Sequence, residues 1–236
     1  MVQRPHTARF MPGVWVFPGG VVDDTDARPP AAFAPIDDSS DWKVAAAREL
    51  MEETGIWLTS TGTHTLPIVS HVFDAVAESS HRIDLDQLIY FSNWITPSVF
   101  PIRFDTRFYF AVSTVGEAAA FNPDELIGAT WVSPIDALQR EDADDWAIAF
   151  PTRRVLELLA SEPSAAGLAD RLTSMDIVPP IQPRLLVGAE EARIVLPDDP
   201  DFAAAGAQQD DPTILERLAD VVASGARVPV EFKKRT

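Results

Sequence analysis

The segment Trp42–Thr54 constrains the fold more than any other part of this 236-residue chain. It is rich in Ala, Leu, Met, Arg and Glu, which are strong helix formers. Gly55 follows it, at the position where a helix commonly ends with a left-handed residue. The sequence therefore predicts a helix over residues 42–54.

Three glutamates share one face of this predicted helix. Glu49, Glu52 and Glu53 are spaced i, i+3 and i+4, so their carboxylates lie close together and repel one another. Mg²⁺ and other hard divalent cations prefer clustered carboxylate oxygens, so the arrangement makes sense as a metal site. Arg48 is placed to orient one of the carboxylates. Taken alone, the pattern fits a solvated acidic helix face at least as well.

The rest of the chain predicts a mixture of helices and strands. Residues 23–40 are rich in Asp, Pro and Ala and predict an irregular excursion, and positions from Leu66 to Val76 show helical spacing. The remaining strands and helices are expected at Trp15–Phe17, Leu88–Ile95, Phe104–Val112, Ala129–Val132, a helix opened by Ser133-Pro134, Arg153–Ala160 and Thr213–Val222. The length suits one large domain, or a domain with a substantial extension. The expected fold class is α/β.

Two separated segments carry a family resemblance. Pro18-Gly19-Gly20 with Asp26, and then Arg48-Glu49-Leu50-Met51-Glu52-Glu53-Thr54-Gly55-Ile56, resemble the Nudix box of the Nudix hydrolase superfamily. Asp26 replaces the usual glutamate, and residues 27–47 stand where the family has seven residues. The resemblance implies a Nudix fold with a mixed central β-sheet flanked by helices. It also implies a Nudix domain at residues 1–160, an insertion at about 27–41, and a C-terminal extension at 161–236 packed on the same domain.

The resemblance also assigns roles within the box. It implies that Glu49, Glu52 and Glu53 bind Mg²⁺ or Mn²⁺, with the carbonyl of Gly20 as a further ligand and Arg48 in support. The general base is either Glu53 or a glutamate on a later loop, for which Glu125 is the candidate. An exposed loop carboxylate is an equally good interpretation of Glu125.

The interruption of the box resembles one branch, the acyl-coenzyme A diphosphatases. Arg9, Arg103 and Arg107 are the expected phosphate partners, because arginine grips phosphate oxygens in pairs. Arg103 fits a structural ion pair with Asp105 slightly better. The aromatic side chains of the middle segments are expected in the core rather than as an adenine platform: Trp94, Phe104, Phe108 and Phe110.

The resemblance therefore implies cleavage of coenzyme A or acyl-coenzyme A to adenosine 3′,5′-bisphosphate and 4′-phosphopantetheine or its acyl form. Hydrolysis of another nucleoside diphosphate derivative, such as a nucleotide sugar or dinucleotide, is the enzymatic alternative. A Nudix-fold sensor that binds a ligand without cleaving it is the alternative from another class. Intact box glutamates favour an enzyme, while Asp26 and the insertion keep the sensor open.

Composition limits the partners. The formal charge is −17, which disfavours nucleic-acid binding, and a small-molecule diphosphate is the expected partner. No apolar run approaches a membrane span of about 18 residues and no signal peptide is evident, so we expect no membrane partner and a cytoplasmic location. Met1–Pro5 resembles the tail of the first Nudix strand. We expect either a natural start further upstream or a shortened sheet that favours a homodimer.

Overall fold

The computed structural model describes residues 1–34, 40–113, 120–189 and 191–224. The strands are β1 (Val2–Gln3), β2 (Trp15–Val16), β3 (Phe33–Ala34), β4 (Ile56–Thr59), β5 (Gly62–Thr65), β6 (Ile83–Asp84), β7 (Ile89–Ile95), β8 (Asp105–Phe110), β9 (Gly128–Ala129), β10 (Pro180–Ile181), β11 (Arg184–Val187) and β12 (Ala192–Val195). The helices are α1 (Ser40–Thr54), α2 (Val72–Glu78), α3 (Pro134–Asp142), α4 (Phe150–Ala160), α5 (Ala165–Thr173), α6 (Phe202–Ala207) and α7 (Ile214–Ala223), with a 3-10 turn, η1 (Leu85–Gln87).

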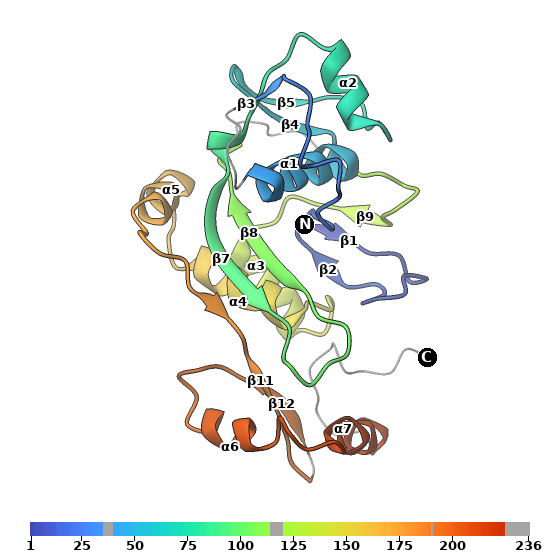
Figure 1. Ribbon diagram of the computed structural model, residues 1–236, viewed down its shortest axis with the longest axis vertical. Helices are drawn as coiled ribbons and strands as arrows, with labels where there is room; N and C mark the ends of the chain where they lie inside the picture. The colour runs from blue at the N-terminus through green and yellow to red at the C-terminus, as the bar shows by residue number, and fades with distance from the viewer. Residues whose placement is uncertain (35–39, 114–119, 190, 225–236) are drawn as a thin grey trace.

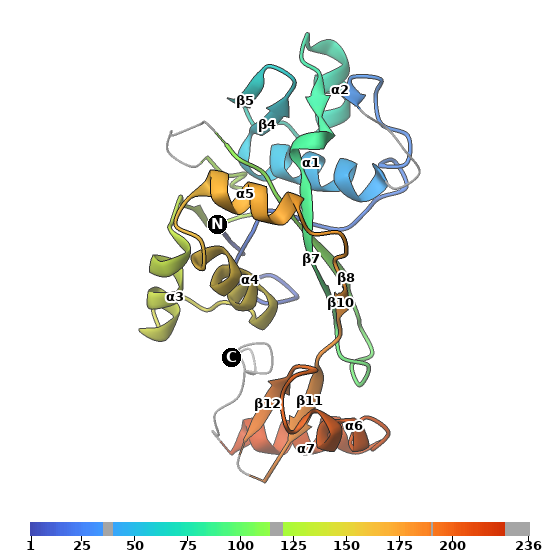
Figure 2. The same cartoon turned by 90° about the vertical axis from the view of Figure 1, so that its left-hand side faces the viewer.

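A long antiparallel hairpin of β7 and β8 runs through the middle of the molecule (Figure 1). On one side of it lies the sheet β3-β6-β4-β5, with α1 between this sheet and the hairpin. A second small sheet, β2-β1-β9, joins the start of the chain to the segment that follows β8. Helices α3, α4 and α5 cover the other side of the hairpin (Figure 2). These layers give an α/β fold with several sheets and flanking helices.

Helix α1 is held by its apolar face. Val44, Ala47 and Met51 are almost completely buried, and they pack against side chains of β3, β4 and α2 in one core cluster. The helix is therefore fixed along its length, which leaves its other faces to present polar groups. Burying such a face stabilises a helix more than its intrinsic propensity does.

The segment after α4 divides into two parts. Leu168 and Leu172 of α5 pack with Phe91 in a core cluster beside the hairpin, and β10 pairs with β7 in parallel. By contrast, β11, β12, α6 and α7 gather around their own apolar cluster at the far end of the molecule (Figures 1 and 2). Val99 and Phe100, at the tip of the hairpin, pack against this cluster. The boundary at residue 160 stays a prediction.

Most of the elements expected from sequence are confirmed, with small shifts at their ends. The helix expected from Leu66 begins only at Val72. Pro67 has no N–H to donate, and the N–H of Leu66 is taken by the carbonyl of Gly55 at 2.8 Å. The strand expected at residues 129–132 is reduced to Gly128–Ala129.

Residues 23–40 were expected to be irregular throughout, but they contain the short strand β3. Phe33 is 2% exposed, packs in the core cluster of α1, and pairs with Ile83 across β3 and β6. The expectation was wrong here because a two-residue strand among prolines and aspartates leaves no periodic signal. Residues 35–39 of the expected insertion lie outside the described part of the chain.

Candidate active site

The C-terminal end of α1 is fixed by a glycine. Gly55 has φ +69°, and a Cβ at this position would lie 2.3 Å from the backbone oxygen of Leu66. Its N–H donates to the carbonyl of Met51 at 2.9 Å, which closes the last turn of the helix. The side chain of Glu53, two residues earlier, therefore leaves the helix in a fixed direction.

Arg48 joins the two halves of the box. Its Nε and Nη2 donate to the two carboxylate oxygens of Asp26 at 2.9 and 3.0 Å, and Nη2 also donates to the carbonyl of Val21 at 2.9 Å. The side chain of Asp26 is fully buried and that of Arg48 is 8% exposed. The hydrogen bond with Asp26 is the largest of the effects that raise the pKa of Arg48. We call this pair the Asp26–Arg48 clasp.

Glu53 is a buried carboxylate among other negative charges. Its Oε2 accepts a hydrogen bond of 2.9 Å from the N–H of Gly19, and the residue is 8% exposed. Burial raises the pKa of Glu53 to about 8. The N–H of Gly19 opposes this shift, and the charges of Glu49 and Glu125 add to it. Such a carboxylate is poised to hold or release a proton near neutral pH.

Glu49 and Glu52 both accept from Nη1 of Arg48, at 3.0 and 2.9 Å. Burial raises the pKa of each, against the lowering effect of Arg48. The Glu49 carboxylate also lies against the backbone of Gly20, where an added Cβ would come 2.2 Å from Oε1. The structure thus brings the three helix glutamates and Gly20 to one place.

We expect Gly20→Ala to reduce kcat at least tenfold, because its new Cβ would displace the Glu49 carboxylate. Gly128→Ala is the matched control. Its Cβ would meet its nearest neighbours, on Gln3 and Trp15, at the ordinary contact distance of 3.5 Å. Steady-state kinetics and thermal melting of both variants check this. Unchanged turnover in Gly20→Ala would show that the position of Glu49 is unimportant.

Glu125 lies beside the helix glutamates although it is far away in sequence. The N–H of Asn122 donates to the backbone oxygen of Glu53 at 2.9 Å, and the N–H of Ile127 donates to that of Gln3 at 3.0 Å. These two bonds anchor the loop that carries Glu125, whose charge raises the pKa of Glu49, Glu52 and Glu53 alike. Glu125 itself is exposed. Both candidates for the general base therefore face the same carboxylate cluster.

Arg4 is a positive charge close enough to act on Glu53, and the sequence did not reveal it. Its positive charge lowers the pKa of Glu53, and its Nε donates to the carbonyl of Phe10 at 3.0 Å. Arg4 directly follows β1, which pairs with β9 just beyond the Glu125 loop. Only this pairing of distant segments brings Arg4 to the glutamates, so no local pattern could have identified it.

Among the described residues, no hydrogen bond or ion pair joins the three arginines expected to contact phosphate to the helix glutamates. Arg9 and Arg103 are exposed, and Nε of Arg103 donates to the carbonyl of Thr96 at 3.1 Å. Within the described residues no ion pair joins Arg103 to Asp105. The guanidinium of Arg107 stacks on the Trp42 ring of α1 at 3.9 Å. Substrate binding by these arginines stays a prediction.

The donor set suits a hard divalent cation. Four carboxylates and one backbone carbonyl are oxygen donors of the kind that such a cation prefers. Burial is the main cause of the raised pKa values of the three helix glutamates, and the charge of Glu125 adds to it. Glu49 and Glu52 are turned toward Arg48, and no three acidic or histidine side chains of the described chain converge on a single point. Binding one ion through all of the box glutamates therefore requires carboxylate rotation.

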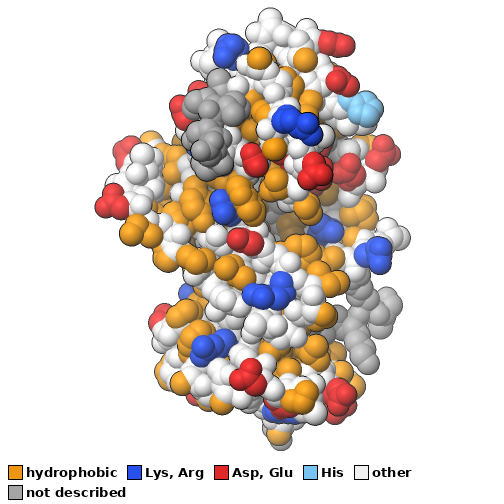
Figure 3. All heavy atoms as spheres, viewed as in Figure 1, with side chains coloured by type: hydrophobic (Ala, Val, Ile, Leu, Met, Phe, Trp, Pro, Cys, Tyr) orange, Lys and Arg blue, Asp and Glu red, His pale blue; other side chains and the backbone are white. Residues whose placement is uncertain are grey.

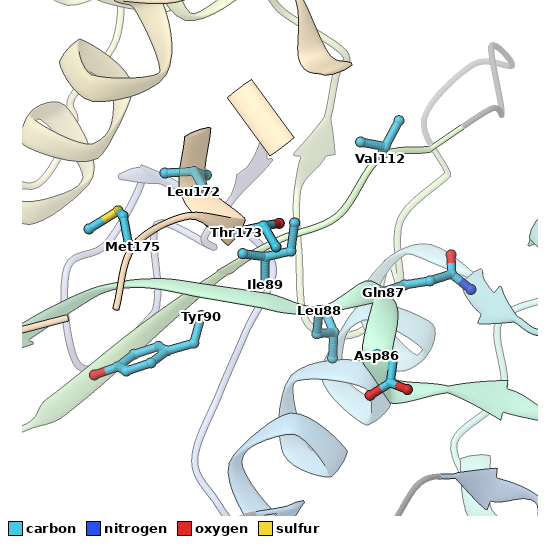
Figure 4. A pocket seen from close by; sticks show the side chains of 9 residues that line it. All are labelled: Asp86, Gln87, Leu88, Ile89, Tyr90, Val112, Leu172, Thr173 and Met175. Atoms are coloured by element: carbon cyan, nitrogen blue, oxygen red, sulfur yellow. The ribbon is translucent and has the colours of Figure 1, made fainter. Parts of the chain in front are cut away.

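The structure has two open cavities, and one of them borders the box. The smaller, of about 250 Å³, opens between the box and the start of α2, and Asp23, Arg48, Glu52 and His71 are among the residues that line it. The larger, of about 550 Å³, is formed by the start of β7, Val112 and the end of α5 (Figure 4). None of the candidate residues lines the larger cavity, so it is separate from the glutamate cluster.

Among the described helices, each is too short or too polar to pass through a lipid bilayer.

Known proteins resemble this chain along most of its length. The family model of the NUDIX domain matches residues 1–152. A Caenorhabditis elegans protein named "Putative nudix hydrolase 7" is 33% identical over 168 residues, which are 67% of this chain and 53% of that protein. The chain thus spans about half the length of this relative. The crystal structure of a NUDIX hydrolase from Alicyclobacillus acidocaldarius is 27% identical, with a TM-score of 0.59, over 75% of this chain and 88% of that one.

Proposed function

Because the chain belongs to the Nudix family, we propose that it hydrolyses a linear diphosphate with the help of Mg²⁺ or Mn²⁺, and that its substrate is coenzyme A or an acyl-coenzyme A. The products are adenosine 3′,5′-bisphosphate and 4′-phosphopantetheine or its acyl form. The observation that carries the proposal is the buried Glu53, held by the N–H of Gly19 beside Glu49 and Glu125.

The proposed reaction divides the work among these residues. Glu49, Glu52, Glu53 and the carbonyl of Gly20 would hold the metal, which when bound supplies positive charge to the phosphoryl oxygens. Glu53 or Glu125 accepts the proton of the attacking water. The two are close enough for the charge of Glu125 to raise the pKa of Glu53. Arg48 donates to both Glu49 and Glu52, and these carboxylates would turn away from it to reach the metal. Arg4 adds a positive charge for an anionic substrate.

The substrate assignment rests on the interrupted box. Twenty-one residues (27–47) separate Asp26 from Arg48, and the Asp26–Arg48 clasp holds the two box halves together despite this length. The same interruption is the feature that resembles the acyl-coenzyme A diphosphatases. The three arginines at positions 9, 103 and 107 supply charge for the extra phosphate of coenzyme A.

We expect coenzyme A compounds to be cleaved best in a panel of diphosphates assayed with Mg²⁺ or Mn²⁺. The panel contains coenzyme A, acetyl and long-chain acyl-coenzyme A, nucleotide sugars and dinucleotides, and the measured quantity is kcat/KM. If a nucleotide sugar or dinucleotide exceeded coenzyme A tenfold, the substrate assignment would be wrong. Absence of turnover for every diphosphate, with folded and metal-loaded protein, would favour a ligand sensor.

A further inference from the structure

Two phenylalanines form an exposed aromatic pair outside the core. Phe10, in the loop between β1 and β2, and Phe104, just before β8, have ring centroids 5.3 Å apart at an angle of 47°. They remain 48% and 40% exposed. Phe104 was expected in the core with Trp94, which is 5% exposed, so that expectation was wrong for Phe104. Contiguous exposed apolar surface marks a binding site more often than scattered single side chains do.

The loop that carries Phe10 is firmly held. The N–H of Arg4 donates to the carbonyl of Val14 at 3.1 Å, and the side chain of Arg4 donates to the carbonyl of Phe10 at 3.0 Å. Met11, the next residue, has φ +48°, a left-handed conformation that non-glycine residues adopt at a cost. The backbone of Phe10 is therefore tied to the start of the chain.

Arg4 lies between the aromatic pair and the glutamates in the order of contacts and charges along the N-terminal segment. The same side chain that bonds to the carbonyl of Phe10 acts electrostatically on Glu53. Figure 3 shows the molecule hollowed below α1, between the β7–β8 hairpin and the N-terminal strands. Phe10 belongs to the loop between β1 and β2 and Phe104 to the segment just before β8, so their contact joins the N-terminal loop to the hairpin.

Each phenylalanine follows an exposed arginine, Arg9 before Phe10 and Arg103 before Phe104. In a chain of formal charge −17, two arginines beside two exposed rings form a local exception. Aromatic faces stack on the π-faces of nucleobases, and arginine binds phosphate oxygens. The surface therefore matches a ligand that is planar and aromatic at one point and anionic at the next.

We propose that Phe10 and Phe104, with Arg9 and Arg103, form the subsite that holds the nucleobase and ribose phosphate of the substrate. The base packs against the two rings, and the arginines bind the phosphate on the ribose. The four residues are specificity residues that take no part in bond cleavage. This inference rests on the proposed function for the identity of the substrate, but its binding step needs no turnover.

Calorimetric titration with adenosine 3′,5′-bisphosphate tests the subsite directly. We expect the double variants Phe10→Leu/Phe104→Leu and Arg9→Ala/Arg103→Ala each to raise the Kd at least tenfold, with melting temperatures near that of the unaltered protein. Ile102→Ala is the control for the rings, since Ile102 is 72% exposed on the same hairpin. Arg154→Ala, on α4, is the control for charge. Both controls should change the Kd less than twofold.

The outcomes separate this inference from the proposed function. With coenzyme A, we expect the phenylalanine variant to raise KM at least tenfold while kcat changes less than threefold. An unaltered protein that binds the bisphosphate but cleaves no diphosphate would refute hydrolysis and keep the subsite. An unchanged Kd in both double variants, or no binding of the bisphosphate by the unaltered protein, overturns the subsite. So does a loss of acyl-chain preference with the Kd for the bisphosphate intact, which would place the acyl end on the rings.

Discussion

Glu53→Gln is expected to lower kcat about 10²-fold or more, because the reaction requires the negative charge of this carboxylate in the transition state. The glutamine keeps the size of the side chain, and its oxygen can still accept the hydrogen bond from the N–H of Gly19. KM should change little by comparison. Steady-state kinetics with the best substrate of the panel measures both constants.

The same variant should be at least as stable as the unaltered protein. Burial raises the pKa of Glu53 to about 8, above its ordinary value of 4.5. A raised pKa means that the protonated form stabilises the fold fully below the ordinary pKa, and that this contribution is lost as pH rises through about 8. Glutamine resembles the protonated form. Its advantage in melting temperature, measured with a metal chelator present, should therefore grow between about pH 5 and pH 8.

Glu78→Gln is the control, since Glu78 is exposed at the end of α2. It should leave both kcat and stability near those of the unaltered protein, because surface substitutions usually change the free energy of unfolding by less than about 0.5 kcal/mol. If Glu53→Gln behaved like Glu78→Gln, Glu53 would belong to a solvated acidic helix face and have no part in the reaction.

Asp26→Asn should cause the largest loss of stability among the substitutions considered. It removes the negative partner that binds this 8% exposed guanidinium through two hydrogen bonds, and it leaves an amide N–H₂ facing the N–H groups of Arg48. Breaking a buried ion pair from one side costs about 3–5 kcal/mol. For a chain of this size that is a fall in melting temperature on the order of 10 °C. Urea unfolding and thermal melting measure the change.

Asp23→Asn is the matched control for the same guanidinium. Its carboxylate is 3.7 Å from Nη2 of Arg48, but its side chain is 64% exposed. Exposed ion pairs contribute about 0–1 kcal/mol, so this variant should melt within a few degrees of the unaltered protein. Equal effects of the two substitutions would mean that Asp26 is not the partner that neutralises Arg48.

Local patterns predicted the parts of the fold that local physics determines. The helix of residues 42–54 carries its own propensity and its own terminating glycine, and it was found to within two residues as α1. The strands around Tyr90 and Phe108 were evident from their aromatic and β-branched residues. The hairpin of β11 and β12 was missed because its short strands lie among prolines and charged residues, and only their pairing and the cover of α7 make them strands.

Some residues of the candidate site could be predicted from local spacing, and others could not. Spacing along one helix sufficed to place Glu49, Glu52 and Glu53 together, and they do lie together. Arg4 depends on the pairing of β1 with β9, which no segment reveals by itself. Phe10 and Phe104 come from segments more than ninety residues apart. The hydrophobic character of Phe104 alone pointed to the core, whereas the structure leaves it exposed just before β8.

The Asp26–Arg48 clasp bears on how chains of this kind can diverge. Because the two residues are joined by side-chain atoms, the length of chain between them is free to vary while the helix glutamates keep their support. The cost of closing a longer loop grows only with the logarithm of its length. A search that demands a fixed number of residues between the two halves of the box will therefore overlook relatives that share the same pair of contacting side chains.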